Sequence, residues 1–125
     1  MTTLLLLWSL VFAQPAVTAS DAWIPESTAG NTAAAYLSIS NPTMYDIYVV
    51  SATSDAAGKV ELRDGDKTVK DITVPSYGSS ELKAGGPHLM LMDVKRALKA
   101  GDNVTLTLMT DVGITVVTTA VVKAR

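Results

Sequence analysis

Residues 104–122 read VTLTLMTDVGITVVTTAVV, and this stretch decides the fold. Val104, Leu106 and Leu108 alternate with threonine and methionine, and period-two alternation is typical of a β-strand with one buried face. After the turn signal Asp111-Val112-Gly113, the run 114–122 is rich in β-branched residues, which favour strands over helices. The stretch therefore predicts two strands joined by a turn.

The same pattern extends through the rest of the chain. Residues 35–39 and 60–62 alternate in the same way, and residues 46–53 contain a further β-branched and aromatic run. Turn signals separate the runs, at 41–42, 64–66, 85–87 and 101–103. A long amphipathic period of 3.6 residues is missing. Short strands at this spacing predict an all-β fold, an antiparallel β-sandwich with Greek-key connections.

Composition limits the classes of function. The chain has 125 residues and a net charge of −2, with no cysteine and a single histidine. Disulfide frameworks, iron–sulfur clusters, thiolate zinc sites, thiol catalysis and multi-histidine metal cages are therefore excluded. Mild acidity argues against a nucleic-acid-binding protein. No phosphate-binding loop or nucleophile elbow is found, so we expect a single domain that is not an enzyme.

The amino terminus predicts export. Residues 4–13, LLLLWSLVFA, form an apolar run that is followed by Gln14-Pro15 and by small residues at 17–20. This order is typical of a secretory signal with cleavage after Ala19 or Ser20. The alternative is an uncleaved anchor, although the run is only half of the ~20 residues that span a bilayer. We expect residues 1–20 to be a signal peptide or amino-terminal anchor, and residues 21–125 to be a periplasmic or other extracytoplasmic domain, membrane-anchored if the segment stays uncleaved.

The segment Pro87-His88-Leu89-Met90-Leu91-Met92 carries the chemistry. In a strand, His88, Met90 and Met92 share one face, while the two leucines point to the core. Same-face neighbours lie about 6.6 Å apart, a gap that an imidazole and a flexible thioether can close around one ion. Thioether and imidazole ligands together suit Cu(I) better than zinc, calcium or magnesium. Ordinary packing of a lone histidine beside methionines is the alternative.

The sequence also resembles the periplasmic PCu(A)C copper chaperone family over most of the predicted domain. The segments that carry the resemblance are 21–24 (DAWI), 33–41 (AAAYLSISN), 59–62 (KVEL) and the block 87–102, which begins PHLMLM and continues through VKRALKAGD. The resemblance implies a cupredoxin-like β-sandwich that carries Cu(I) in the periplasm and supplies it to cytochrome oxidase assembly. It implies His88 and Met90 as the metal ligands.

The metal site departs from the family pattern. Family members bind Cu(I) through two histidines and two methionines, and the second pair matches His88 and Met90. The first histidine should follow Leu62, but that position is Arg63, and the hairpin at 64–71 contains no methionine and is about eight residues shorter than usual. A positive charge at Arg63 would disfavour a bound cation. Met44, Met92 and Met109 are further candidate donors that the sequence does not place.

Two hypotheses follow. The first is an exported Cu(I)-binding protein with a reduced His/Met site, which passes the metal by ligand exchange to a copper-acceptor protein such as an oxidase subunit. The second is a metal-free structural or accessory subunit of a membrane oxidase complex. The basic cluster Lys95, Arg96 and Lys99 is either a solvated loop or a docking patch for an acidic partner. Neither the partner's identity nor the oligomeric state follows from the sequence.

Overall fold

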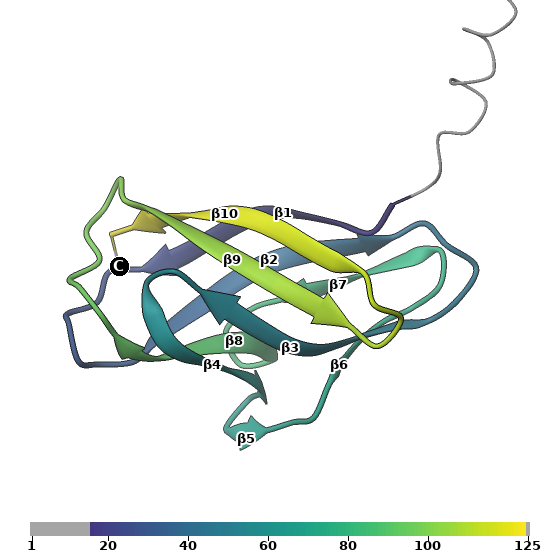
Figure 1. Cartoon of the computed structure of the whole chain (residues 1–125), viewed down its shortest axis with the longest axis horizontal. Helices are drawn as coiled ribbons and strands as arrows, with labels where there is room; N and C mark the ends of the chain where they lie inside the picture. Colours follow the sequence, from purple (N-terminus) through teal and green to yellow (C-terminus); the bar gives the residue numbers. More distant parts are fainter. Residues whose placement is uncertain (1–15, 125) are drawn as a thin grey trace, which may run out of the picture.

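The computed structural model describes residues 16–124, and these residues fold into a β-sandwich (Figure 1). The strands are β1 (Thr18–Pro25), β2 (Ala33–Asn41), β3 (Ile47–Ser54), β4 (Ala57–Asp64), β5 (Lys67–Thr68), β6 (Ile72–Val74), β7 (Gly78–Leu82), β8 (Pro87–Val94), β9 (Asn103–Thr110) and β10 (Thr115–Lys123). The predicted all-β class is confirmed. The quoted stretch 104–122 forms most of β9 and β10, which pair antiparallel from Met109–Thr115 to Asn103–Val121.

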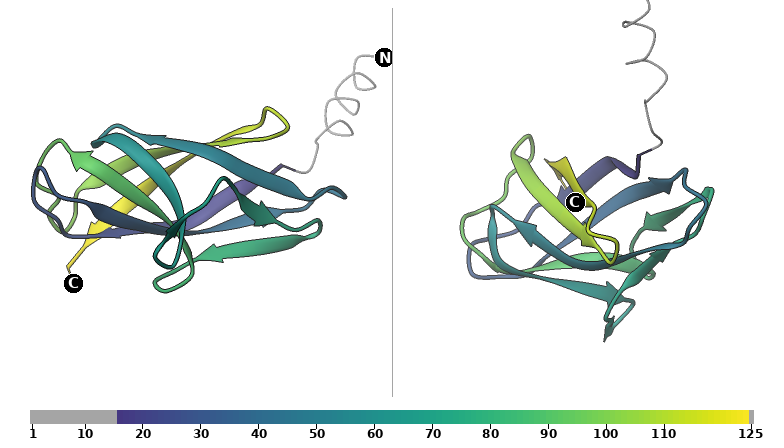
Figure 2. Two further views of the ribbon diagram at one scale, coloured as in Figure 1. Left: turned by 90° about the horizontal axis from the view of Figure 1, so that it is seen from below. Right: turned by 45° about the vertical axis from the view of Figure 1, so that its right-hand side comes forward.

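The strands follow one hydrogen-bonded path, β5-β4-β8-β2-β1-β10-β9-β3-β6, and β7 also pairs with β2. The path folds back on itself, so that β3, β9 and β10 form one layer and β4, β8 and β2 form the other (Figure 2). One pairing differs from the predicted antiparallel arrangement, because β1 runs parallel to β10 with Trp23 beside Val121. The sheet is therefore mixed.

The core lies between the two layers. In every strand that shows the predicted alternation, the apolar side chains of the alternating pattern face the core. The fully buried large side chains include Ile24, Ile39, Leu89, Leu91, Leu106 and Leu108. Burial of this apolar surface is the main force that holds the layers together.

A β-bulge in β1 determines which face Trp23 occupies. Ser20 pairs with Ser38 and Trp23 pairs with Tyr36, so β1 contains one more residue than β2 between these two pairs. The extra residue is accommodated at Asp21, whose φ is 55°. Since successive strand residues alternate between faces, the extra residue moves Trp23 to the outer face and sends Ala22 and Ile24 into the core.

Two features differ from or fall outside the sequence prediction. Residues 1–15 of the predicted signal or anchor lie outside the described residues, and Thr18–Ser20 form the start of β1, paired with β2. The predicted boundary at residue 20 therefore falls inside a strand. Residues 78–82, GSSEL, form β7, which the sequence analysis did not predict because small polar residues dominate it.

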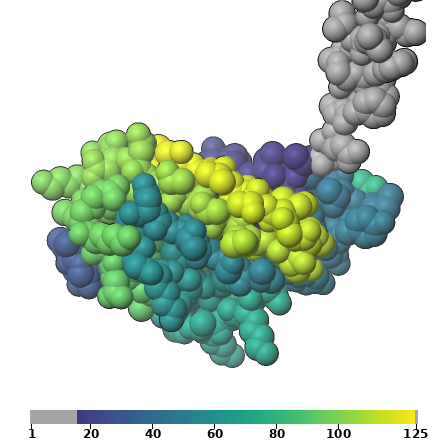
Figure 3. Space-filling view, viewed as in Figure 1, coloured from purple at the N-terminus to yellow at the C-terminus, as the bar shows by residue number. Residues whose placement is uncertain are grey.

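The outer surface of β9 and β10 is rich in threonine and valine and faces the viewer in Figure 3. None of the elements in residues 16–124 is a helix long and apolar enough to cross a bilayer.

Candidate metal site

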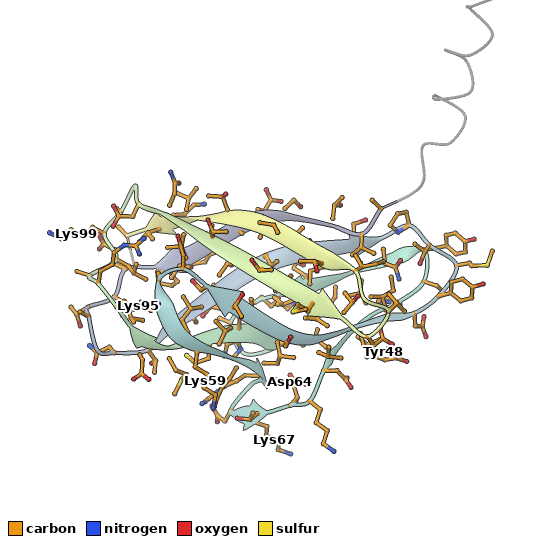
Figure 4. The ribbon with its side chains drawn as sticks, viewed as in Figure 1. Tyr48, Lys59, Asp64, Lys67, Lys95 and Lys99 are labelled. Carbon is orange, nitrogen blue, oxygen red and sulfur yellow. The ribbon has the colours of Figure 1, made fainter. Side chains whose placement is uncertain are left out.

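Strand register places the predicted donors on the outer face of the β4–β8–β2 layer. His88 lies opposite Arg63, Met90 lies opposite Glu61 on β4 and Ala34 on β2, and Met92 lies opposite Lys59. Leu89 and Leu91 are fully buried on the other face. The predicted division of this segment into a core face and an outer face is therefore confirmed. We call the outer face, which carries His88, Met90 and Met92, the donor face. Lys59, labelled in the lower part of Figure 4, is the residue of β4 opposite Met92.

His88 is held in one orientation by a backbone contact. Its Nδ1 atom lies 2.9 Å from the carbonyl oxygen of Gly86. A carbonyl oxygen only accepts hydrogen bonds, so Nδ1 carries a proton, and in the neutral ring Nε2 carries the free lone pair. Metal-ligating histidines typically donate their other ring N–H in this way, which fixes the tautomer and the ring orientation.

The Nε2 atom of His88 remains accessible although the residue is only 7% exposed. Within residues 16–124, Nε2 has no hydrogen-bond partner, and no side-chain nitrogen or oxygen is both buried and without a partner. Nε2 is therefore not fully sealed from solvent. A lone pair in this position can coordinate a metal ion without prior loss of a protein hydrogen bond.

Aromatic side chains flank His88 on the β2 side. The ring centroids of Tyr36 and His88 lie 6.2 Å apart, and those of Trp23 and Tyr36 lie 5.1 Å apart. The Lys123 ammonium group lies 5.7 Å from the Trp23 centroid, within the range of a cation–π contact. The β1 bulge creates this row, because it puts Trp23 on the same face as Tyr36.

Charged side chains flank His88 on the β4 side. The Nη2 atom of Arg63 lies 2.9 Å from Oε1 of Glu61, and Nζ of Lys59 lies 3.3 Å from Oε2 of the same carboxylate. The hydrogen bond from Arg63, followed by that from Lys59, lowers the pKa of the Glu61 carboxyl. The guanidinium is thus directed along β4 to a carboxylate. The expected positive charge at residue 63 is present, and Glu61 partly neutralises it.

Arg63→Gln is expected to raise the pKa of Glu61 toward its usual range, and Lys59→Gln is expected to raise it less, because Arg63 makes the larger contribution. Since the folded-state pKa is lowered, the stability contributed by these ion pairs is present above the unfolded-state pKa. It is lost as the pH falls through the folded-state value. Carboxyl carbon-13 NMR titration of the three proteins measures the shifts. Equal pKa values in both variants would show that Arg63 has no special role.

The other candidate methionines lie in different places. Met92 shares the donor face of β8, whereas Met44 lies in the β2–β3 loop and Met109 lies on the outer face of β9. Among residues 16–124, no group of three His, Cys, Asp or Glu side chains gathers to hold a metal. The donor face therefore offers one imidazole, two thioethers and one carboxylate that is already paired.

A groove of about 910 Å³, which was not predicted from the sequence, lies beside the aromatic row. Trp23 and Tyr36 line it together with Leu82, Lys83 and Lys123. These residues come from β1, β2, β7, β10 and the β7–β8 connection. Tyr36 belongs to both the groove and the surroundings of His88, so the two features adjoin. The only sequence signal was the pair of aromatic residues, which the strand pattern alone assigned to the core or its rim.

The sequence of this chain is similar to those of known proteins. The family model described as "Putative lipoprotein LpqE-like" matches residues 17–122. A curated relative, "Putative lipoprotein Lxx21020" of Leifsonia xyli subsp. xyli, is 33% identical over 101 residues, which cover 74% of this chain and 60% of the relative. The chain thus spans about three-fifths of the length of that relative.

Solved structures share the fold. The copper-bound PCuAC domain from PmoF2 superposes with a TM-score of 0.79 at 18% identity, over 90% of this chain and 97% of that domain. The solution structure of CuI-DR1885 from Deinococcus radiodurans gives a TM-score of 0.74 at 32% identity, over 89% of this chain and 81% of that protein. With the family model matched across nearly all the described strands, the chain belongs to the LpqE-like family of putative lipoproteins, and its fold is that of PCuAC domains.

Proposed function

We propose that this chain is an extracytoplasmic copper-binding protein that holds one Cu(I) ion through Nε2 of His88 and the thioether of Met90. The observation that carries the proposal is the hydrogen bond from Nδ1 of His88 to Gly86, which leaves Nε2 free on the face that also presents Met90. The similarity to CuI-DR1885 at 32% identity supports Cu(I) as the cargo. Soft neutral donors without a thiolate favour Cu(I) over divalent ions.

Transfer would proceed by ligand exchange. A site with two protein donors leaves coordination positions on Cu(I) open, so a donor from an acceptor protein can bind before His88 or Met90 dissociates. No charged ligand of this chain has to be protonated or deprotonated during the exchange. The acceptor then retains the ion because it supplies more donors or better ones. The acceptor we propose is a copper-containing membrane enzyme such as an oxidase subunit.

Titration of the full chain with Cu(I) against a competing chelator tests the proposal. His88→Ala and Met90→Ala are each expected to weaken Cu(I) binding about tenfold or more, because each removes one of two ligands. Met109→Ala is the matched control, since Met109 is a half-exposed methionine on β9, away from the donor face. If all four proteins compete equally for Cu(I), the proposed site does not exist.

A second function is favoured by the position of Arg63. Its side chain occupies the place directly opposite His88, where a further donor would otherwise stand, and binds Glu61 there. In this alternative, the domain is a metal-free accessory subunit of a membrane oxidase complex. Stable co-purification with such a complex, together with failure of the wild-type chain to bind Cu(I), would support it over a carrier.

A further inference from the structure

The end of the sandwich where β1 begins carries an unusual concentration of exposed apolar side chains. Three connections meet there, 42–46, 75–77 and 111–114 (Figure 1), and we call them the apolar pole. Of the nine large hydrophobic side chains exposed in residues 16–124, five lie in these connections. They are Met44 (62% exposed), Tyr45 (68%), Tyr77 (72%), Val112 (56%) and Ile114 (37%). A patch of this kind on a small domain marks a contact surface.

The apolar pole is built to hold these side chains outward. Tyr77 adopts φ of 53°, a left-handed conformation that is costly for a bulky residue. Its backbone N–H donates to the Thr43 carbonyl over 3.0 Å, and the Asp46 carboxylate accepts the Ser76 N–H over 2.9 Å. These bonds tie connection 75–77 to connection 42–46. The strained backbone conformation thus keeps the Tyr77 side chain exposed. A residue that adopts this conformation at lower cost would be sufficient if the segment were only a turn.

The apolar pole and the opposite end of the sandwich differ in charge. The connections of the apolar pole contain no lysine or arginine, and their acidic residues are Asp46 and Asp111. Each of these carboxylates accepts a backbone N–H, from Ser76 and Tyr48 respectively. Lys95 and Lys99 lie at the opposite end (Figure 4). Attraction to anionic groups therefore plays no part at the apolar pole, and tyrosine and methionine supply an uncharged, amphipathic contact, as at the interface of a membrane.

The described residues begin at the same end of the sandwich. Thr18 pairs with Ser40 at the end of β2, next to connection 42–46. Ala13, the last residue of the apolar run 4–13, precedes Ala16 by three residues, which span at most about 11 Å. If that run enters a bilayer, Ala16, at the same end of the domain as the apolar pole, lies within about that distance of the lipid. A ten-residue apolar run is too short to span a bilayer, and stable attachment generally requires a second contact.

We propose that the apolar pole is a membrane-docking surface, which seats Met44, Tyr45 and Tyr77 in the interface of a bilayer. Docking at this end leaves the donor face of β8 on the side of the domain, in water. The proposal does not depend on metal binding.

Fluorophores attached at single positions test which end of the domain faces the membrane. The chain has no cysteine, so Met44→Cys, Val112→Cys and the control Lys99→Cys each accept one environment-sensitive fluorophore. The full chain is mixed with phosphatidylcholine vesicles that carry a nitroxide quencher on the acyl chains. A blue shift with quenching is expected at residues 44 and 112, and neither change at residue 99. An equal response at all three positions, or none, overturns the proposal. A blue shift that depends on protein concentration, without quenching, points instead to a second copy of the chain and also overturns it.

Side-chain replacement provides the second measurement. The double variant Tyr45→Ser/Tyr77→Ser is expected to lower vesicle binding of the full chain about tenfold in a flotation assay. Val117→Ser is the matched control, because Val117 is 62% exposed but lies on the outer face of β10. His88→Ala should leave vesicle binding unchanged, which separates this proposal from the proposed copper site. Equal loss in the double variant and in Val117→Ser would contradict a specific docking surface.

Discussion

Replacing Arg63 with histidine (Arg63→His) is expected to tighten Cu(I) binding about 100-fold. Residue 63 is the direct cross-strand neighbour of His88, and side chains in such pairs have Cβ atoms about 5 Å apart on the same face. A histidine there would add a third soft or borderline donor beside His88 and Met90. It would also remove a positive charge near the ion, and two unit charges 6 Å apart repel by about 3 kcal/mol at an effective dielectric constant of 20.

Arg63→Gln separates the two causes. It removes the charge and adds no comparable metal ligand, so its gain in Cu(I) affinity should be about tenfold at most, because Glu61 already offsets part of the Arg63 charge. Competition titrations of the wild type and both variants give the ratios. If Arg63→His binds Cu(I) no more tightly than Arg63→Gln, residue 63 cannot contribute a ligand, and the ion, where bound, lies farther along β8.

Asn41→Asp is expected to lower the free energy of unfolding by about 3–5 kcal/mol, a large effect for a substitution that preserves shape. Asn41 is fully buried, and its Nδ2 donates to the carbonyl oxygens of Tyr45 at 2.7 Å and Val74 at 3.0 Å. Its Oδ1 accepts from the backbone N–H and the hydroxyl of Thr43. An aspartate would place a carboxylate oxygen against two carbonyl oxygens and would remove both hydrogen bonds that Nδ2 donates.

Asn41→Ala is the comparison, because it removes all four hydrogen bonds without placing a charge against the carbonyls. It should destabilise the domain less than Asn41→Asp when urea unfolding is measured at neutral pH. Asn41 also fixes the start of connection 42–46, so both variants should loosen Met44 and Tyr45 at the apolar pole. An aspartate variant as stable as the wild type would mean that Nδ2 does not donate to Tyr45 and Val74.

Most of the fold could be predicted from the sequence because strict alternation leaves one arrangement for each strand. Leu106 and Leu108, or Leu89 and Leu91, can only be buried together on one face. The parallel pairing of β1 with β10 could not be predicted, since pairing partners depend on the whole topology. The bulge at Asp21 was equally inaccessible, because nothing in the local sequence requires a left-handed aspartate there.

The candidate site was predictable only in part. The shared face of His88, Met90 and Met92 follows from the two-residue period of a strand. The tautomer of His88 could not be predicted, because it depends on the carbonyl of Gly86 in the β7–β8 connection. The pairing of Arg63 with Glu61 joins residues two apart on one strand face, and the prediction of an unfavourable charge at Arg63 did not include this partner.

The division of β2 between two neighbours determines how the donor face can be reached. β7 pairs with residues 37–41 and β8 pairs with residues 33–35, so β8 begins only halfway along β2. Tyr36, beside His88, stands five residues from Asn41, a rise of about 17 Å. With the apolar pole seated on lipid, His88 would sit at that elevation on a flank of an upright domain. An acceptor protein would have to approach from the side of the domain, parallel to the membrane. Its own copper-binding site would need to lie at the same height above the membrane.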